Sequence, residues 1–312
     1  MKKAKKIGKV ALLWGGWSAE REVSFVSGKA VKDGLEMLGY DICCIDPDPN
    51  IGKFIDQLKK SKADVIFNAL HGSPGEDGTL QAVMDLLKIP YTHSGMLASA
   101  AAMDKPFALD IFRSHNIPVA KGMVVDKQDV LRGDPLPRPY VLKPAAEGSS
   151  IGIYIIKDGT NNLENILSNW SYGKILAEEY IPGRELTVSV MDDGMGGAQA
   201  LGVTELVASL EFYNFEAKYT DGKTTHIAPA DLPFALSEEC KSYAVRAHHA
   251  LGCRGVSRSD FRYDDANGRL VILEVNTQPG MTPLSLLPEQ ALLNGMSFEK
   301  LCEWMLQHAR YG

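Results

Sequence analysis

Two different spacings of hydrophobic residues follow each other along the first hundred residues of this 312-residue chain. Short apolar runs, typical of buried strands, alternate with longer segments in which apolar residues recur every three or four positions, as on one face of a helix. The predicted strands cover residues 9–14, 41–46 and 65–70, and the predicted helices cover residues 18–38 and 51–61. Strands that alternate with helices predict a parallel sheet with right-handed crossovers, so we expect an α/β domain here.

The first predicted helix has a candidate start and a candidate buried face. Ser18 follows a Gly-Gly turn and belongs to the residue types that cap helices, so the helix is expected to begin there. Helical spacing then predicts a buried stripe made of Val23, Val26, Ala30, Leu35 and Leu38. The turn itself, GGWSA, lacks the G-x-G-x-x-G spacing of a dinucleotide-binding loop, which makes a Rossmann interpretation poor.

Beyond Pro118 the pattern shifts towards strands. Before that point, helices are predicted over residues 79–87 and from Asp104 to about His115. The strands predicted after it cover residues 140–143, 152–156, 175–180, 186–191 and 201–206. The polar, proline-containing segment 127–139 is predicted to be a loop, and a last helix is expected over about residues 297–309. The chain is therefore expected to combine an α/β region with an α+β region.

A hairpin is predicted near the C-terminus. Residues 256–261 and 273–281 have the composition of strands, with an Asn-Gly turn signal between them. Pairing residue 260 with residue 274 leaves residues 266–268 as a three-residue loop, and Gly268 then occupies the left-handed position that such loops favour. A two-residue turn would place the polar side chains on opposite faces.

In this register four polar side chains share one face of the hairpin. Arg258 and Asp260 alternate on the first strand, and Glu274 and Asn276 alternate on the second. Two carboxylates, an amide oxygen and a guanidinium would then converge, and oxygen-only ligands suit Mg²⁺. The alternative is a solvated strand face with ordinary charges, but Glu-x-Asn directly after the apolar run 271–273 makes little sense as a surface.

Composition places the chain among soluble globular proteins of two or three domains. Apolar residues make up 45% of the sequence and charged residues 23%, and no apolar run approaches the length of a membrane span. The formal net charge of −6 argues against nucleic acid as the main partner, because phosphate binding needs a basic surface. The five cysteines form no C-x-x-C pair, and we read no signal peptide, so reduced thiols in a cytoplasmic protein are expected.

Two segments have the composition of nucleotide-binding loops, although each also has an ordinary interpretation. KPAAEGSSIG, residues 143–152, follows a predicted strand, and its small residues would let backbone N–H groups approach phosphate oxygens beside Lys143. The alternative is a generic Gly/Ser hairpin loop. EEYIPGRE, residues 178–185, could pair its backbone with a purine edge and a carboxylate with ribose hydroxyls, or it could be an exposed acidic turn. By themselves, His71 and the Lys-Tyr pair at 218–219 carry little weight.

In their order along the chain, these motifs resemble those of the D-alanine–D-alanine ligases. The matching runs are GGWSAEREVS at 15–24, LHGSPGEDG at 70–78, MDK at 103–105, KPAAEGSSIG at 143–152, EAKY at 216–219, RSD at 258–260 and EVNTQPGMT at 274–282. The resemblance covers essentially the whole chain, and its HG-x-x-GEDG and E-x-N-T-x-PGMT blocks are highly specific. It implies an N-terminal parallel α/β (pre-ATP-grasp) domain at residues 1–100, then a two-lobed ATP-grasp fold with lobes at 101–187 and 188–312.

The resemblance also implies a reaction. An ATP-dependent ligase of this family makes D-alanyl-D-alanine for peptidoglycan precursor synthesis. ATP phosphorylates the carboxylate of one D-alanine, and the amine of a second D-alanine attacks the acylphosphate, with release of ADP and phosphate. The implied cofactors are ATP and two Mg²⁺ ions, or Mn²⁺ in their place. A homodimer is expected, without a nucleic-acid or membrane partner.

Individual residues receive roles from the same resemblance. The ATP contacts would be Lys105, Lys143 and Lys218 at the phosphates, Glu178, Glu179, Tyr180 and Ile181 at the adenine, and Glu185 at the ribose. The metal ligands would be Asp260, Glu274 and Asn276, in agreement with the strand-face argument. Glu20 would bind the ammonium of the first D-alanine, linked through Ser149 and Tyr219, and His71 would be a further substrate residue. Arg258 and the Gly280 N–H would stabilise the tetrahedral intermediate, and Ser285 and Leu286 would hold the second D-alanine.

Two alternatives stay open at this point. Related ligases join D-alanine to D-serine or D-lactate, and the ATP and metal residues do not discriminate among them, although Tyr219 favours an amine as the second substrate. A regulatory nucleotide-binding module without turnover would be expected to lack Arg258, Lys218 or a metal ligand, and all are present. Residues 212–225 are expected to form a loop that closes over ATP and excludes water from the acylphosphate.

Overall fold

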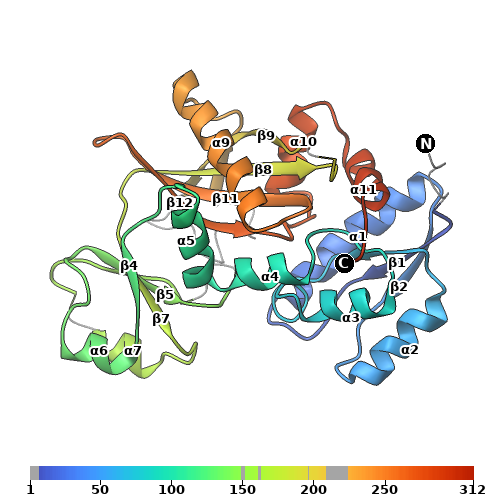
Figure 1. Cartoon of the computed structure of the whole chain (residues 1–312), viewed down its shortest axis with the longest axis horizontal. Helices are drawn as coiled ribbons and strands as arrows, with labels where there is room; N and C mark the ends of the chain where they lie inside the picture. The colour runs from blue at the N-terminus through green and yellow to red at the C-terminus, as the bar shows by residue number, and fades with distance from the viewer. Residues whose placement is uncertain (1–6, 149–151, 161–162, 196, 209–223) are drawn as a thin grey trace.

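The computed structural model describes residues 7–148, 152–160, 163–195, 197–208 and 224–312, arranged as three sheets with flanking helices (Figure 1). The strands are β1 (Lys9–Leu13), β2 (Asp41–Ile45), β3 (Val65–Asn68), β4 (Gly122–Val125), β5 (Tyr140–Pro144), β6 (Tyr154–Ile156), β7 (Ile175–Glu179), β8 (Arg184–Asp192), β9 (Gln199–Ala208), β10 (Thr224–Ile227), β11 (Gly255–Asp264) and β12 (Arg269–Asn276). The helices are α1 (Arg21–Met37), α2 (Ile51–Ser61), α3 (Thr79–Leu87), α4 (Met96–Met103), α5 (Lys105–Ser114), α6 (Lys127–Arg132), α7 (Leu163–Ser168), α9 (Phe234–Ala250), α10 (Leu286–Leu293) and α11 (Phe298–Gln307). None of these described helices is both long and apolar enough to cross a membrane.

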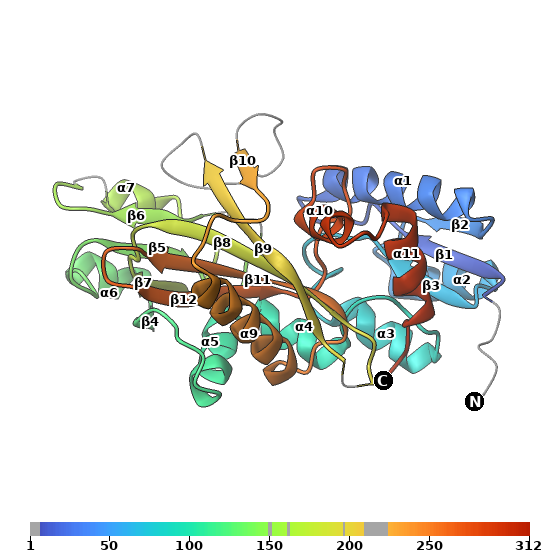
Figure 2. The ribbon, with the colours of Figure 1, turned by 90° about the horizontal axis from the view of Figure 1, so that it is seen from above.

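The N-terminal sheet is parallel, as predicted, with the strand order β2-β1-β3. On one face Phe54 of α2 shares a core with Leu13 of β1. On the other face Leu35 of α1 and Met305 of α11 share a core with Leu12 of β1. Strand β1 is buried on both sides, which explains its continuous apolar sequence. The last helix of the chain therefore packs back onto its first domain, beside α1 (Figure 2).

Helix α1 begins at Arg21, three residues later than predicted. Ser18 is engaged in the preceding turn instead: its Oγ donates to the carbonyl of His71 at 2.6 Å and accepts from the N–H of Glu20 at 3.1 Å. The prediction of Ser18 as the N-cap was therefore wrong. Its hydroxyl ties the turn after β1 to the loop after β3, which is a contact between segments 53 residues apart.

The buried face of α1 also differs from the predicted stripe. Its buried residues are Ser24, Ser27, Gly28, Val31, Gly34 and Leu35, so Leu35 alone was predicted correctly. Val26 is instead 53% exposed. The physical reason is close approach, because a Cβ added to Gly28 would lie 2.7 Å from the Cβ of Trp14. The small residues Ser24, Ser27, Gly28 and Gly34 permit this close approach, Val31 and Leu35 pack into the core, and Val26 points towards solvent.

The central sheet has the antiparallel order β4-β7-β5-β6. Tyr140, Leu142 and Trp170 are buried in its core. The first part of the segment predicted as a loop forms α6, so that prediction was wrong. The Asp129 carboxylate accepts the N–H of Asp126 at 3.2 Å, which stabilises the start of this short helix, and the buried Val130 anchors it.

The C-terminal sheet is antiparallel, with the order β10-β9-β8-β11-β12. Helices α5 and α9 cover one face, where Phe112 and Ala244 share a core with Val188 and Ile272. Helix α5 runs as predicted, with the Asp104 side chain accepting the N–H of Phe107 at its start. The opposite face of the sheet carries the predicted polar side chains.

The β11–β12 hairpin has the predicted register at its polar end. Asp260 lies opposite Glu274, and Arg258 lies opposite Asn276. The predicted three-residue loop was wrong, because the register shifts between residues 260 and 261, where Leu273 is an extra residue in β12. The strands then close on a four-residue loop, 265–268, in which Gly268 has a φ of 61°. The bulge changes the turn and leaves the polar face intact.

Candidate active site

Two adjoining pockets lie where the three sheets meet, and both are lined by Lys105, Glu147, Gly148 and Glu274. We call the pocket next to the N-terminal sheet the first pocket and the one next to the central sheet the second pocket. The predicted residues that line only the first pocket are Glu20, His71, Arg258, Asn276, Gly280, Ser285 and Leu286. Those that line only the second pocket are Lys143, Glu178, Glu179, Tyr180, Ile181, Glu185 and Asp260. Every predicted site residue in the described part of the chain therefore lines one of the two pockets.

Three predicted site residues are not among the residues that the structure describes. Ser149, Lys218 and Tyr219 lie outside the described residues, as does most of the predicted loop 212–225. The described neighbour of Ser149 is Gly148, which lines both pockets.

The hairpin brings its charges together as paired ions. Arg258 donates from Nε and from a terminal nitrogen to the two carboxylate oxygens of Asp260, each at 2.8 Å. Glu274 lies 3.4 Å from the Lys105 ammonium, and the side-chain oxygen of Asn276 accepts the N–H of Gln278 at 2.8 Å. Each acidic group thus has a neighbouring cation within the protein.

These side chains fit a hard divalent cation. The donors are two carboxylates and one amide oxygen, projecting from one face of two paired strands, and such oxygen ligands suit Mg²⁺ or Mn²⁺. The described residues contain no group of three or more His, Cys, Asp and Glu side chains that could hold a metal ion. A cation at Asp260, Glu274 and Asn276 would therefore need further ligands from water or from a bound phosphate.

The two lysines occupy different surroundings. The Lys143 ammonium lies 2.5 Å from a carboxylate oxygen of Glu178, and the two side chains are 7% and 4% exposed. Lys105 Nζ donates to the carbonyl of Glu147 and also faces Glu274. The second oxygen of Glu178, Oε1, is buried and has no hydrogen-bond partner among the described residues. The wall of the second pocket thus holds a buried acceptor that a ligand N–H group could satisfy.

The segment after β7 is held by arginines of the C-terminal sheet. Arg269 donates to both oxygens of Glu179, at 2.7 and 2.9 Å, and its guanidinium lowers the pKa of that carboxyl. Arg262 donates to the Ile181 carbonyl at 3.2 Å and lies 3.5 Å from the Glu185 carboxylate. The turn between them requires Gly183, which has a φ of 94°, because an added Cβ would lie 2.2 Å from the Tyr263 carbonyl oxygen.

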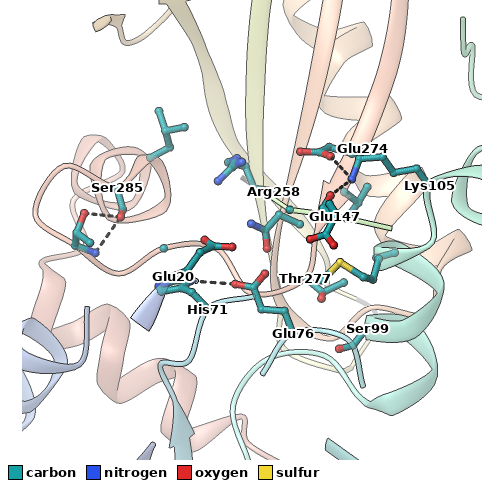
Figure 3. Close-up of a pocket in the computed structure, with 18 of the residues that line it drawn as sticks. Glu20, His71, Glu76, Ser99, Lys105, Glu147, Arg258, Glu274, Thr277 and Ser285 are labelled. Carbon is teal, nitrogen blue, oxygen red and sulfur yellow. Dashed lines mark hydrogen bonds and ion pairs between the residues drawn. The ribbon is translucent and has the colours of Figure 1, made fainter. Parts of the chain in front are cut away.

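The side of the first pocket next to the N-terminal sheet carries the acidic residues Glu20 and Glu76. Glu20 is 7% exposed, and His71 lies beside it with both ring nitrogens engaged, one 2.9 Å from Ser27 Oγ and the other 2.9 Å from Glu76 Oε1. In the view of Figure 3, Arg258 lies between Ser285 on one side and Glu274 with Lys105 on the other.

The far side of this pocket is formed by the start of α10. Ser285 is the N-cap residue of the helix, and its Oγ accepts the N–H of Thr282 at 2.9 Å. A Cβ on Gly280 would lie 2.8 Å from that same Oγ. A glycine is therefore needed for the backbone of residue 280 to approach the Ser285 side chain this closely.

Several residues of the site were not singled out from the sequence. Glu76, Glu147 and Thr277 lie inside the quoted motifs, yet their own side chains were given no role. Arg262 could have been found by extending the alternation from Arg258 and Asp260 along the same strand face. Arg269 carries no comparable signal, because its partner Glu179 is 90 residues away in the chain.

Comparisons with known proteins agree with this geometry. Residues 50–94 match the family model described as D-ala D-ala ligase N-terminus, and residues 111–307 match the one described as D-ala D-ala ligase C-terminus. A D-alanine--D-alanine ligase of Gluconobacter oxydans is 51% identical over 304 residues, which is 96% of this chain and 99% of that protein. One from Rhizorhabdus wittichii is 50% identical over 310 residues, covering 97% of each chain.

Solved structures show the same fold. The D-alanine--D-alanine ligase of Bacillus anthracis complexed with ATP has a TM-score of 0.79 and 31% identity, covering 97% of this chain and 96% of that one. The VanG D-Ala:D-Ser ligase of Enterococcus faecalis also has a TM-score of 0.79, with 27% identity, covering 96% of this chain and 98% of that one. The expected fold class, a parallel α/β region followed by the antiparallel sheets of an ATP-grasp fold, is confirmed. By sequence and by structure, this chain belongs to the D-alanine–D-alanine ligase family.

Proposed function

We propose that this chain uses ATP to join two D-alanines into D-alanyl-D-alanine, with release of ADP and phosphate, for peptidoglycan precursor synthesis. One observation carries the proposal: every predicted site residue in the described part of the chain lines one of two adjoining pockets that share Lys105 and Glu274. Phosphoryl transfer from a nucleotide to a carboxylate depends on holding the two groups next to each other beside cationic charge, and Lys105 lies in the wall that the two pockets share. Full-length relatives at about half identity support the same reaction.

ATP occupies the second pocket in this proposal. Glu178 to Ile181 line the adenine end, and the unpartnered Oε1 of Glu178 is an acceptor for an exocyclic amine. Glu185 accepts hydrogen bonds from the ribose hydroxyls, and Lys105, Lys143 and Lys218 hold the phosphates. For Glu179 the contact is through the backbone, because its carboxylate is taken by Arg269.

The proposed metal ligands are Asp260, Glu274 and Asn276, which would hold two Mg²⁺ ions, or Mn²⁺ in their place. Bound there, the ions would neutralise charge on the transferring phosphoryl group. The protein's own contribution is placement, because Glu274 belongs to both pockets and Asp260 faces the one assigned to ATP.

The two D-alanines occupy the first pocket. Glu20 binds the ammonium of the first D-alanine, within a hydrogen-bonded triad completed by Ser149 and Tyr219. The carboxylate of this D-alanine accepts the phosphoryl group and becomes D-alanyl phosphate. His71 shapes the wall of this site, in keeping with its two engaged ring nitrogens.

The second D-alanine attacks from the side of α10. Ser285 and Leu286 fix its carboxylate and backbone, and its neutral amine attacks the acylphosphate carbon. Arg258 and the N–H of Gly280 stabilise the oxyanion of the tetrahedral intermediate, a contribution typically worth about 10²–10³ in rate for each donor. Collapse of the intermediate releases phosphate.

The division into domains is part of the same proposal. Each of the three sheets supports one unit: residues 1–100, 101–187 and 188–312. Because β8 begins at Arg184, the second boundary is better placed at Gly183. A cytoplasmic location and a homodimer are proposed on family grounds alone.

Product identification tests the function. Purified protein is incubated with ATP, Mg²⁺ and D-alanine, with D-serine and D-lactate as competitors. We expect D-alanyl-D-alanine as the main product, with one phosphate released for each dipeptide. Folded, ATP-binding protein that releases no phosphate would refute the proposal, and a mainly D-alanyl-D-serine or D-alanyl-D-lactate product would correct its second substrate.

Selectivity for the second substrate is assigned to Tyr219. Removing its hydroxyl would leave a partner in the proposed triad unsatisfied, at a cost of about 1–3 kcal/mol in a dry site. Tyr219→Phe should let D-lactate compete, most visibly at lower pH, where the D-alanine amine is protonated. The measurement is the product ratio between about pH 6 and 9, a range over which the neutral fraction of the D-alanine amine rises with pH. A ratio that does not change would shift the assignment to residues 283–286.

A further inference from the structure

A fully buried chain of hydrogen bonds lies behind Asp260. Thr187 of β8 is directly opposite Asp260 of β11, and its Oγ1 donates to Asp260 Oδ1 at 2.6 Å. Thr187 is 0% exposed. A valine would have almost the same shape in this position, so the hydroxyl is explained by its acceptor and not by packing.

Thr187 is in turn held by helix α10. The side-chain amide of Gln290, which is 1% exposed, donates to the Thr187 carbonyl at 3.2 Å and to Thr204 Oγ1 at 3.0 Å. The amide oxygen of Gln290 accepts the N–H of Ser189 at 2.8 Å. One glutamine therefore binds the backbone on both sides of residue 188 and connects β8 to β9.

The two oxygens of Asp260 are occupied unequally as a result. Oδ1 accepts two hydrogen bonds, from Thr187 Oγ1 and Arg258 Nε, which uses both of its lone pairs. Among the described residues, Oδ2 accepts from Arg258 alone, at 2.8 Å. A cation bound by Asp260 would therefore meet Oδ2, and the carboxylate could not turn to offer Oδ1 without breaking the bond to Thr187.

We propose that Thr187 is a positioning residue that fixes Asp260 for one-oxygen metal binding, and that Gln290 holds Thr187 in place. This inference rests on the proposed assignment of Asp260 as a metal ligand. It also links the metal site to the proposed site of the second D-alanine, because Gln290 lies one turn along α10 from Leu286, and Ser285 caps that helix. Residues that orient a metal ligand typically change metal affinity by about 10–100-fold when they are removed.

The experiment measures metal binding without turnover. Free Mn²⁺ is followed by electron paramagnetic resonance while the protein is titrated in the presence of a non-hydrolysable ATP analogue. Thr187→Val should weaken Mn²⁺ binding by about 10-fold or more, and Thr187→Ser, which keeps the hydroxyl, should restore most of the affinity. Thermal unfolding of the metal-free variants checks that the fold is retained.

Ser259→Ala is the matched control. Ser259 precedes Asp260 on the same strand and is as buried as Thr187. Its side chain points to the other face of the sheet, and its Oγ has no partner among the described residues. Loss of this hydroxyl should leave Mn²⁺ affinity unchanged. An equal loss of affinity in Ser259→Ala and Thr187→Val would mean that removing any buried hydroxyl disturbs the sheet, which would overturn the specific role of Thr187.

Gln290→Met provides a second, independent variant. It keeps the length of the side chain and replaces the amide by an apolar group, so Mn²⁺ affinity should fall less than in Thr187→Val, and the KM for the second D-alanine should rise. Asp260→Asn distinguishes a failure of the metal assignment from a failure of the roles given to Thr187 and Gln290. If it leaves Mn²⁺ binding unchanged, the metal assignment fails; if it abolishes binding while Thr187→Val and Gln290→Met bind as the wild type does, only the present inference fails.

Discussion

Arg269, the first residue of β12, holds both carboxylate oxygens of Glu179, the last residue of β7, at 2.7 and 2.9 Å. The two strands belong to different sheets, so this ion pair bridges the central and C-terminal sheets beside the segment that lines the second pocket. Both side chains are more than one third exposed, which limits the contribution of the pair to overall stability. Its importance is therefore expected to lie in holding the segment after β7, which lines the second pocket, in place.

Arg269→Gln should raise the KM for ATP by up to about fivefold, equivalent to about 1 kcal/mol, while kcat changes little. The reason is that the segment after β7 loses its tether to the sheet that carries Asp260. Steady-state kinetics with varied ATP provide the measurement. Arg132→Gln breaks an exposed ion pair on α6 and serves as the control; an equal rise in that variant would contradict the tether.

Because Arg269 lowers the Glu179 pKa from 4.5, the contribution of the pair is complete above about pH 4.5 and is lost as the pH falls below it.

Lys143→Met should destabilise the nucleotide-free protein by about 3–5 kcal/mol, because it leaves the Glu178 carboxylate buried and unpaired. The double variant Lys143→Met with Glu178→Gln should recover much of this loss, since neither member of the buried pair is then charged. Denaturant unfolding of the wild type, both single variants and the double variant provides the comparison. Simply additive losses would show that the two buried groups do not depend on each other.

Acid should destabilise the protein already below about pH 6.5, through two buried histidines. Burial lowers the pKa of His93 to about 3 and that of His248 to about 4, the latter partly offset by Asp192. Between those values and 6.5 the unfolded chain binds more protons than the folded one, so stability rises with pH by up to about 1.4 kcal/mol per pH unit for each histidine.

His93→Asn isolates one of these contributions. Asparagine tolerates the positive φ of 71° at this position. The variant should make the unfolding free energy less dependent on pH between about pH 5 and 6.5. The reduction corresponds to up to one proton fewer taken up on unfolding. The measurement is denaturant unfolding at several pH values. His115 is exposed on α5's C-terminal side, and His115→Asn should keep the wild-type slope. An unchanged slope in His93→Asn would place the acid sensitivity elsewhere.

Glu274→Gln should raise the Mg²⁺ concentration needed for half-maximal activity by at least about tenfold, because a charged oxygen ligand is replaced by a neutral one. Its effect on folding should be small, since the side chain is 30% exposed and its paired Lys105 keeps a second acceptor in the Glu147 carbonyl. Mg²⁺ titrations of activity and thermal unfolding of the metal-free protein provide the two measurements. A large loss of stability with an unchanged Mg²⁺ requirement would contradict the assignment.

The polar face of the hairpin could be predicted from the sequence because strand alternation is a local property of the backbone. Side chains two residues apart point to the same side whatever the rest of the protein does. The pairing of Asp260 with Glu274 was also predicted correctly, although the turn was not, because the extra residue Leu273 and the longer loop together occupy the same stretch of chain. The bulge at Leu273 left no signal in the alternation at the polar end, so only the structure located it.

The face of α1 was decided by tertiary structure instead. Helical spacing alone fits more than one apolar stripe, and the choice depends on how closely the helix approaches its neighbour. Contact with Trp14 selects the side that carries Gly28, and Val26, which the spacing placed in the core, is 53% exposed. A distance between two elements is not encoded in the spacing within one of them.

The sequence by itself determined the family, the parallel and antiparallel regions, and a large part of the side chains that line the two pockets. Those properties follow from residue type, motif order and local periodicity. Only the tertiary structure decided the contacts between distant segments: Arg269 with Glu179, Lys143 with Glu178, Gln290 with Thr187, and α11 with the N-terminal sheet. Each contact joins charges, buried polar groups or apolar faces, and each of these groups has many candidate partners along the chain. Packing in three dimensions selects one partner.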